Sequence, residues 1–400
     1  MNLQSDVCVI GNGAIGKAAA LGFAQSGMSV TLLAPPSAVR TPTLQELTRW
    51  DLRVYALNQV ARALLSSIKV WDALDASRVA PVDAMVVRGD GEQRAGNLAF
   101  DAYSARVDAL AWIVEDSNLN QALDAALKFA PGVQLIAGQA IRLSADSDSA
   151  TVLLENGDTL GASLIVGADG GHSWVRGQCD IDIDYRPYGQ RAIVANFSCE
   201  KPHHGVASQW FTSADGIVAL LPLPGQRVSL VWSAPEHLAE ALLHESSDQL
   251  AQRLSLLPDQ QLGRLHPLQP EMVKDFPLAL IRPHAIIAPR VALIGDAAHV
   301  VHPLAGHGMN LGFSDVATLL KTIAERGAWQ NCGDSRILAR YARARKEDIL
   351  LMQLATDGLE RLFAADFEPL RIARNIGLNL INKIPVIKKR LMSHALGKIL

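Results

Sequence analysis

Hydrophobic and polar positions at the start of the chain predict a strand–helix–strand unit. Residues 6–10 (DVCVI) are an apolar run typical of a buried strand, and residues 29–33 (SVTLL) are a second one. The segment between them, residues 17–26, is expected to form a helix that ends at Gly27. This order of elements predicts a parallel sheet with a helix packed on its face.

The rest of the chain mixes both periodicities. Residues 50–71 predict a turn followed by a helix, and residues 111–129 predict an amphipathic helix. From residue 179 to 270, strand-like runs with intervening turns predict a separate antiparallel sheet. Beyond residue 315 the pattern is helical, with a long amphipathic run at residues 336–356.

Composition agrees with a globular protein of two joined domains. The chain has 400 residues, of which 49% are hydrophobic and 19% charged. A net charge of −3 gives no reason to expect a nucleic acid as partner. The four cysteines are scattered, which predicts reduced thiols and no metal site. With no recognisable signal peptide and no apolar run of membrane-spanning length, a cytoplasmic location is expected.

A glycine motif separates the first predicted strand from the first predicted helix. Residues 11–16 read GNGAIG, a GxGxxG pattern. In such a turn the first glycine permits the tight bend, the second lets the backbone approach a pyrophosphate, and the third lets helix and strand pack closely. The pattern predicts dinucleotide binding by the following residues: Gly11, Gly13, Ala14, Ile15 and Gly16.

One part of the usual nucleotide-binding unit is missing. A carboxylate usually ends the second strand and holds the ribose hydroxyls, but here Ala34 is followed by two prolines. Either another group supplies this contact, or the nucleotide is held less tightly by on the order of 1–3 kcal/mol.

Two acids, Asp169 and Asp296, also follow predicted strands. Beyond Asp296 the chain passes two histidines and a proline and enters a glycine-rich turn and an apolar helix. A helix whose first turn is kept bare by glycine suits an anionic or electron-rich ligand. His299 and His302 do not predict a metal site, because no third ligand follows them.

These stretches together resemble the group A flavoprotein monooxygenases, which are aromatic hydroxylases with one FAD-binding domain. The resemblance rests on GNGAIG, on ADGGHSWVR at residues 168–176 and on LIGDAAHVVHPLAGHGMNLG at residues 293–312. A narrower resemblance, to the bacterial ubiquinone-biosynthesis hydroxylases, rests on DLRVYALN (51–58), WIVED (112–116), ALLPL (219–223) and RIARNIGLNLINKIPVIKK (371–389).

The resemblance implies an α/β fold. It comprises a Rossmann-like FAD-binding domain of the three-layer ββα, para-hydroxybenzoate-hydroxylase-like type, an inserted antiparallel-sheet substrate domain and a C-terminal helical tail. The expected boundaries are 1–75, 101–178 and 272–335 for the FAD-binding domain, 76–100 and 179–271 for the substrate domain, and 336–400 for the helical region.

The resemblance also implies roles for individual residues. Asp296 is expected to hold the ribityl hydroxyls of FAD, Asp169 to contact FAD, and the helix after Gly306 to point its N–H groups at the flavin. Arg53 faces a phosphate or the flavin edge, or is simply a solvated arginine. The remaining expected FAD contacts are Pro303, Gly306, Gly308, Met309 and Asn310. Candidate pocket residues are His307, Pro303, Trp210 and Trp232, although aromatic residues on strands are more often core.

The implied function is an FAD-dependent monooxygenase that uses NADH or NADPH and O₂. Its substrate would be a polyprenylated phenol or benzoquinol intermediate of ubiquinone biosynthesis, and its ring would take the distal oxygen of a flavin C4a-hydroperoxide. Two alternatives stay open. One is a related flavoprotein hydroxylase acting on another phenolic substrate, and the other is a flavin-poor accessory protein that docks in a quinone-biosynthesis complex.

Three residues depart from the pattern of the ubiquinone-biosynthesis hydroxylases: Ala34, Asp116 in place of Asn, and His307 in place of Gln. A carboxylate near a diphosphate repels it unless it is paired or protonated. The tail, residues 369–400, interleaves Lys and Arg with Leu and Ile and has no Asp or Glu. It predicts either a packed helical tail with a basic rim, or a peripheral contact with the inner membrane or with a quinone-biosynthesis complex.

Overall fold

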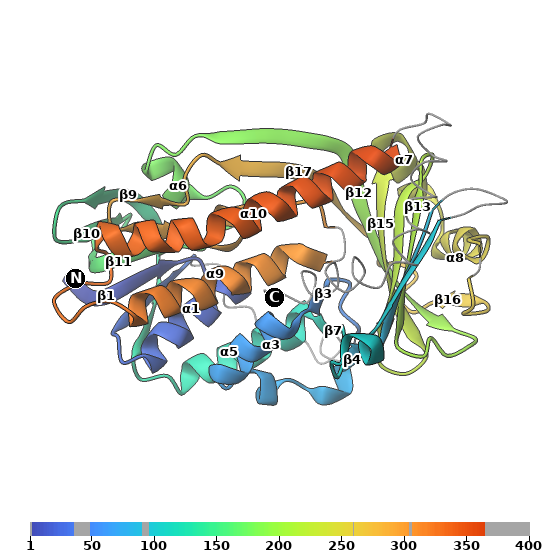
Figure 1. Ribbon diagram of the computed structural model, residues 1–400, viewed down its shortest axis with the longest axis horizontal. Coiled ribbons are helices and arrows are strands. Elements are labelled where there is room, and N and C mark those ends of the chain that lie inside the picture. Colours follow the sequence, from blue (N-terminus) through green and yellow to red (C-terminus); the bar gives the residue numbers. More distant parts are fainter. Residues whose placement is uncertain (1, 36–48, 90–95, 259, 304–305, 365–400) are drawn as a thin grey trace.

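Two large sheets, each covered by helices, organise the molecule (Figure 1). The computed structural model describes residues 2–35, 49–89, 96–258, 260–303 and 306–364. None of the helices in these ranges combines the length and apolar character needed to cross a bilayer. The basic tail at 369–400 lies outside the described residues.

The first sheet contains the parallel strands that the βαβ pattern predicted. Its strand order is β18-β19-β11-β1-β2-β8, with β10 added to β11 and β9 added to β10. The strands from β19 to β8 are parallel, whereas β18, β10 and β9 pair antiparallel. The bounds are β1 Asn2–Ile10, β2 Val30–Ala34, β8 Val133–Ala137, β9 Ala140–Ala145, β10 Ala150–Leu154, β11 Thr159–Gly167, β18 Ile287–Ala288 and β19 Val291–Leu293.

Helices cover one face of this sheet, and the β9–β10 meander with α6 packs over the other, which gives three layers. In Figure 1, α1, α9 and α10 run next to one another in front of the strands. Gly22 of α1 lets the side chain of Leu320 on α9 approach closely, because a Cβ there would collide with it. The bounds are α1 Ala14–Gln25, α3 Gln59–Ser67, α5 Asp116–Lys128, α6 Trp174–Gln178, α9 His307–Ala324 and α10 Ser335–Ala364.

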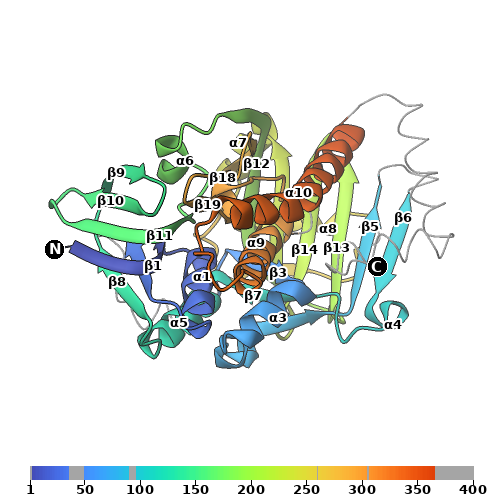
Figure 2. The same ribbon diagram turned by 60° about the vertical axis from the view of Figure 1, so that its left-hand side comes forward.

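The second sheet is mainly antiparallel, and its strand order is β16-β12-β15-β14-β13-β5-β6, with β17 paired to β12. Figure 2 shows β5 and β6 at the far edge of this sheet, where β5 pairs parallel to β13. The bounds are β5 Ala84–Arg88, β6 Asn97–Asp101, β12 Ile183–Cys199, β13 Val206–Thr212, β14 Gly216–Leu223, β15 Arg227–Pro235, β16 Leu265–Pro267 and β17 Lys274–Pro283. The short helix α4 (Ala102–Ala105) follows β6.

The two faces of the second sheet have different neighbours. Helices α7 (Glu236–His244) and α8 (Ser247–Ser255) pack on the outer face. The inner face turns toward the first sheet with its helices, here called the first unit. Asn196 Nδ2 on this face donates to Asp51 O at 2.9 Å. The α/β fold class predicted from the sequence is confirmed.

Two predicted helices begin later than expected, because each is preceded by a strand. A three-stranded sheet consists of β3 Val54–Leu57, β7 Ala111–Glu115 and β4 Val79–Val82. The first two lie inside the stretches expected to be a turn plus helix and one continuous helix. Asn58 then caps α3, with its side chain accepting from Ala61 N–H at 3.0 Å. A buried strand leading directly into a helix carries apolar residues of both periodicities, which hid these boundaries.

Candidate active site

Three turns meet at one edge of the first sheet. They follow β1, β11 and β19, which are parallel neighbours: Ile10 is paired with Gly167, and Gly167 with Leu293. Ala168 N–H donates to Ile10 O at 2.8 Å, and Ile294 N–H donates to Gly167 O at 2.9 Å. The glycine motif and both predicted acids therefore share one edge, where open α/β sheets bind ligands.

The GxGxxG turn is closely packed on one side and open on the other. A Cβ at Gly11, whose φ is 115°, would collide with the carbonyl of Ala168, and one at Gly16 would collide with the carbonyl of Gly11. A Cβ at Gly13 would meet nothing within 4 Å. Gly13 is also the N-cap of α1. The helix thus presents an uncovered N-terminal backbone, which is an anion-binding arrangement.

Asp296 lies in the 3-10 turn η4 (Gly295–Ala297), directly after β19. Its side chain is exposed, but enough protein surrounds the carboxyl to desolvate it, and this burial raises its pKa. The nearby charges of His299 and Arg53 lower the pKa of the Asp296 carboxyl in part. Arg53 is itself exposed and lies 5.5 Å over the ring of Tyr55. The structure therefore brings Arg53 and Asp296 to the same place.

Helix α9 begins beside these turns. Its N-cap, Gly306, has a φ of 68°, and a Cβ there would lie 3.2 Å from the Cβ of Ala56. The Asn310 side chain fixes the first turn, because its Nδ2 donates to Ala56 O at 2.7 Å and its Oδ1 accepts from Asn58 N–H at 2.9 Å. A Cβ at Gly308 would meet nothing within 4 Å. The helix start, with its partial positive charge, is open on that side.

The residues around the start of α9 differ in burial and in hydrogen-bond partners. Pro303 is half-buried, and its carbonyl accepts from Gly306 N–H at 3.1 Å. His302 is fully buried, its Nε2 bonds to Gln190 Oε1 at 3.0 Å, and burial lowers its pKa to about 4. Met309 packs against the core of the first unit. The His307 side chain lies outside the described part of the structure, so its role near the flavin stays a prediction.

Asp169 is engaged within its own turn. Its carboxylate accepts from Ser173 Oγ at 2.5 Å and from Val175 N–H at 3.0 Å at the start of α6. Arg176 on α6 donates to Gly171 O at 2.7 Å and to Ala297 O at 3.1 Å. The arginine therefore ties the Asp169 turn to the Asp296 turn, and the FAD contact expected of Asp169 stays a prediction.

Asp116, which departs from the pattern of the ubiquinone-biosynthesis hydroxylases, is paired. Its carboxylate accepts from Tyr55 Oη at 2.7 Å and from Asn120 Nδ2 at 2.9 Å. Asn120 Oδ1 in turn accepts from Lys17 Nζ at 3.1 Å. Burial and the Asp116 charge raise the pKa of Tyr55, so the phenol stays a donor. Both partners are neutral donors that do not cancel the carboxylate charge, so the effect of Asp116 on a nearby diphosphate stays a prediction.

The ribose end of the site is only partly described. Ala34 is buried at the end of β2, and its carbonyl accepts from Gly138 N–H at 2.9 Å. Residues 36–48, which follow it, lie outside the described ranges. Whether another group replaces the missing carboxylate stays a prediction.

A buried charge cluster, which the sequence reading missed, holds the Asp296 turn in place. The Asp315 carboxylate on α9 accepts from Gly295 N–H at 2.9 Å, from His299 Nε2 at 2.6 Å and from Arg345 Nε on α10 at 2.7 Å. Asp315 is 0% exposed and Arg345 1% exposed, so this is an ion pair in the protein interior. The sequence does contain a sign of this cluster, because Asp315 stands inside the apolar helix sequence LGFSDVATLL.

Trp210 and Trp232 belong to the core on the outer face of the second sheet, away from the three turns. Both pack with residues of α7 and α8. Their indole N–H groups donate to Pro258 O at 2.8 Å and to Asp215 O at 2.7 Å. The alternation of side chains along β13 turns Phe211 to the inner face instead. The structure thus corrects the two tryptophans from pocket candidates to core residues.

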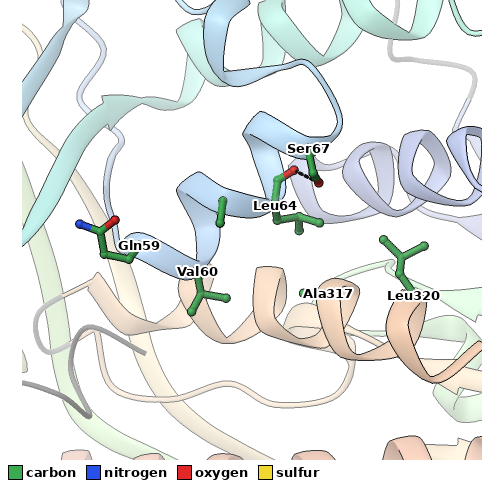
Figure 3. Close-up of a pocket in the computed structure, with 7 residues that line it drawn as sticks. Gln59, Val60, Leu64, Ser67, Ala317 and Leu320 are labelled. Atoms are coloured by element: carbon green, nitrogen blue, oxygen red, sulfur yellow. Dashed lines mark hydrogen bonds between the residues drawn. The ribbon is translucent and has the colours of Figure 1, made fainter. Parts of the chain in front are cut away.

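A groove of about 440 Å³ lies elsewhere, between α3 and α9 (Figure 3). In Figure 3, Leu64 of α3 and Leu320 of α9 lie on opposite sides of it. None of the predicted FAD contacts lines this groove, and it is formed by the following residues: Gln59, Val60, Ala63, Leu64, Ser67, Ala317 and Leu320. Among the described residues, no group of three or more potential ligands is arranged to hold a metal ion.

The edge formed by the three turns fits FAD. The open backbone at Gly13 suits the pyrophosphate, and the exposed acceptor Asp296 suits the ribityl hydroxyls. The open start of α9 suits the negative charge of a reduced flavin ring. Buried Nδ1 atoms of His299 and His302 lack partners within the described ranges, as expected beside a polar ligand.

Comparison with known proteins agrees with this geometry. Residues 4–350 match a family model described as an FAD binding domain. The chain is 34% identical to ubiquinone hydroxylase UbiL of Rhodospirillum rubrum over 98% of this chain and 90% of that protein. It is 33% identical to 3-demethoxyubiquinol 3-hydroxylase of Escherichia coli over 99% of both chains.

Solved structures show the same fold. The p-nitrophenol 4-monooxygenase of Pseudomonas putida superimposes with a TM-score of 0.78 at 19% identity, covering 100% of this chain and 99% of that one. The Klebsiella pneumoniae protein HpxO, solved with FAD and uric acid, has a TM-score of 0.74 at 19% identity and covers 99% and 97%. The chain therefore belongs to the FAD-binding-domain family, among the FAD-dependent hydroxylases that include the ubiquinone hydroxylases.

Proposed function

We propose that this FAD-dependent aromatic monooxygenase hydroxylates the ring of a polyprenylated phenol or benzoquinol in ubiquinone biosynthesis, with NADH or NADPH as reductant. The observation that carries the proposal is the meeting of the three-turn edge with the inner face of the second sheet. Gln190 on β12 bonds to His302, which follows the Asp296 turn, and Asn196 on β12 donates to Asp51, which lies beside Arg53. Relatives that cover nearly the whole chain and are named for ubiquinone-ring hydroxylation support it.

The chain's own residues would bind and orient the reactants. Bound FAD supplies the activation of O₂ and the transfer of one oxygen atom to an electron-rich ring. Asp296 accepts hydrogen bonds from ribityl hydroxyls, and the start of α9 stabilises negative charge at the adjoining end of the flavin ring. His302, with a pKa of about 4, remains neutral at physiological pH.

The inner face of the second sheet suits an aromatic ring. Most of the buried side chains on this face are apolar, among them Val194, Phe211, Ile217 and Ala219. Such a wall excludes water from the reacting ring and protects oxygen transfer from side reactions. A contact of the basic residues 369–400 with anionic lipid or with a quinone-biosynthesis complex belongs to the same proposal, supported by their sequence alone.

Genetic complementation tests the function directly. The gene would be expressed in bacterial strains that each lack one quinone-ring hydroxylase, with the Asp296→Ala variant as control. We expect the wild-type protein to restore ubiquinone in one of these strains, and the intermediate that disappears, identified by its mass, to reveal the ring position. Failure to restore any of them, by a protein that is expressed and binds FAD, would reject a role in ubiquinone-ring hydroxylation and favour another phenolic substrate.

A further inference from the structure

Two neighbouring polar side chains on the inner face of the second sheet each bury an oxygen atom that has no hydrogen-bond partner among the described residues. Asn196 on β12 and Ser229 on β15 stand directly opposite each other in the antiparallel ladder. They are 3% and 0% exposed. Within the described ranges, neither Asn196 Oδ1 nor Ser229 Oγ has a hydrogen-bond partner. Unpaired buried oxygens destabilise a folded protein, so their presence at one spot calls for a functional explanation.

A third side chain, Gln269, adds an unpaired oxygen beside the same loop. Gln269 Nε2 donates to Trp50 O at 3.0 Å, and Asn196 Nδ2 donates to the neighbouring Asp51 O at 2.9 Å. Each amide nitrogen is thus fixed by a backbone carbonyl, which also fixes which end of each amide is the oxygen. Gln269 Oε1, like Asn196 Oδ1, is a buried acceptor without a partner among the described residues.

The position of this set relates it to the candidate active site. Asp51 Oδ1 accepts from Arg53 N–H at 3.0 Å, and the Arg53 charge reaches the Asp296 carboxyl. Apolar side chains flank the set: Leu221 pairs with Ser229 on one side, and Val194 pairs with Val231 one step along the face. Two fixed acceptors and one hydroxyl, flanked by apolar side chains, match a ring that carries O–H donors.

We propose that Asn196, Ser229 and Gln269 form the polar recognition site for the hydroxyl groups of the aromatic substrate. The Ser229 hydroxyl oxygen accepts a hydrogen bond from one ring hydroxyl, and the two amide oxygens accept hydrogen bonds from further ring hydroxyls. The inference rests on the proposed function and adds the residues that select a hydroxylated ring over its O-methylated analogue. Such sites discriminate because the analogue leaves the buried acceptors unpaired.

Ligand titration of the FAD-loaded protein tests this site with guaiacol and its O-methyl ether, veratrole. Both keep the ring, and only guaiacol has an O–H donor. Binding would be followed by the perturbation of the flavin absorbance. We expect wild-type protein to prefer guaiacol by roughly 3- to 10-fold, the range for one neutral hydrogen bond. Ser229→Ala should lose most of this preference, and Ser229→Cys, which is similar in size but a weak hydrogen-bonding group, should lose it too.

The thermal midpoint of the ligand-free protein supplies an independent readout. Ser229→Ala removes an unpaired buried hydroxyl, so we expect a midpoint equal to or above that of the wild type. Ser198→Ala is the matched control, because Ser198 on β12 already donates to His266 O at 3.4 Å. The control should keep the preference for guaiacol.

Three results would overturn the proposal: a wild-type protein without preference, a Ser229→Ala variant that keeps it, or a lowered midpoint in Ser229→Ala, which would indicate a structural hydroxyl. These results leave the proposed function intact, since complementation of a hydroxylase-deficient strain decides that separately.

Discussion

At the scale of single residues, the site consists of groups left open rather than of reactive side chains. Asp296 is exposed after β19, and the backbone at Gly13 and Gly308 has free space where a side chain would stand. The sequence revealed these residues because each occupies a fixed place in a short motif. It did not reveal that Asp116 is paired with Tyr55 and Asn120, since those contacts depend on how β3 and α5 pack.

Asp296→Ala should abolish the retention of FAD and leave the protein folded. Loss of charge-assisted bonds to the ribityl chain weakens FAD binding by roughly 10- to 100-fold. Because the side chain is exposed, the thermal midpoint of the FAD-free protein should hardly change. The flavin-to-protein absorbance ratio after purification is the measurement, and an unchanged ratio would remove Asp296 from the FAD site.

Gly13→Ala should weaken FAD binding and leave the fold unchanged. A methyl group at Gly13 meets no protein atom within 4 Å, but it occupies the space through which a pyrophosphate approaches α1. We expect a dissociation constant for FAD at least about tenfold higher, with unchanged far-ultraviolet circular dichroism. Gly177→Ala is the control, because its Cβ also meets nothing within 4 Å but lies on α6, outside the glycine turn. Equal FAD affinities for both variants would contradict the assignment of the GNGAIG turn.

At the scale of elements, α9 and α10 hold the Asp296 turn through one buried carboxylate. Asp315 joins the turn to α9, and Arg345 joins both to α10. Burial alone would raise the pKa of Asp315, but His299 and Arg345 outweigh it and lower the pKa. Sequence motifs could not predict this clamp, which consists of Asp315 and Arg345. Its partners come from separate helices, and only the fold brings them together.

Asp315→Asn should destabilise the protein by about 3–5 kcal/mol, since it removes the buried partner of Arg345 and leaves that charge with only the half-exposed Asp348. The depressed pKa of Asp315 means that its stabilisation is present above the pKa of an unfolded carboxyl, about 4, and is lost as the pH falls through the native value. The variant should therefore lose less stability than wild type on acidification. Urea unfolding at a series of pH values measures both effects.

Asp348→Asn is the control for this clamp. Asp348 is the other partner of Arg345, at 2.6 Å, but its side chain is 42% exposed. We expect its removal to change the free energy of unfolding by no more than about 1 kcal/mol. If Asp348→Asn cost as much as Asp315→Asn, the buried carboxylate would not be the clamp.

At the scale of the whole molecule, the three-turn edge of the first sheet faces the inner face of the second sheet. The βαβ start, the second antiparallel sheet and the long helix α10 were all predictable, because each has a sustained hydrophobic period. The strands β3 and β7 were not, since each runs without a break into a helix. The alternation that puts Trp210 outside and Ser229 inside is readable only once the register of β13 and β15 is known.

The central claim is that the assembled protein transfers one oxygen atom from O₂ to a polyprenylated phenolic ring. The most direct measurement supplies the FAD-loaded protein with NADPH or NADH, a prenylated phenol and isotopically labelled O₂, and follows the product by mass spectrometry. We predict a product with one additional, labelled oxygen atom on the ring, formed by wild-type protein but not by Asp296→Ala. Consumption of reductant that yields only hydrogen peroxide, with the phenol unchanged, would contradict the account.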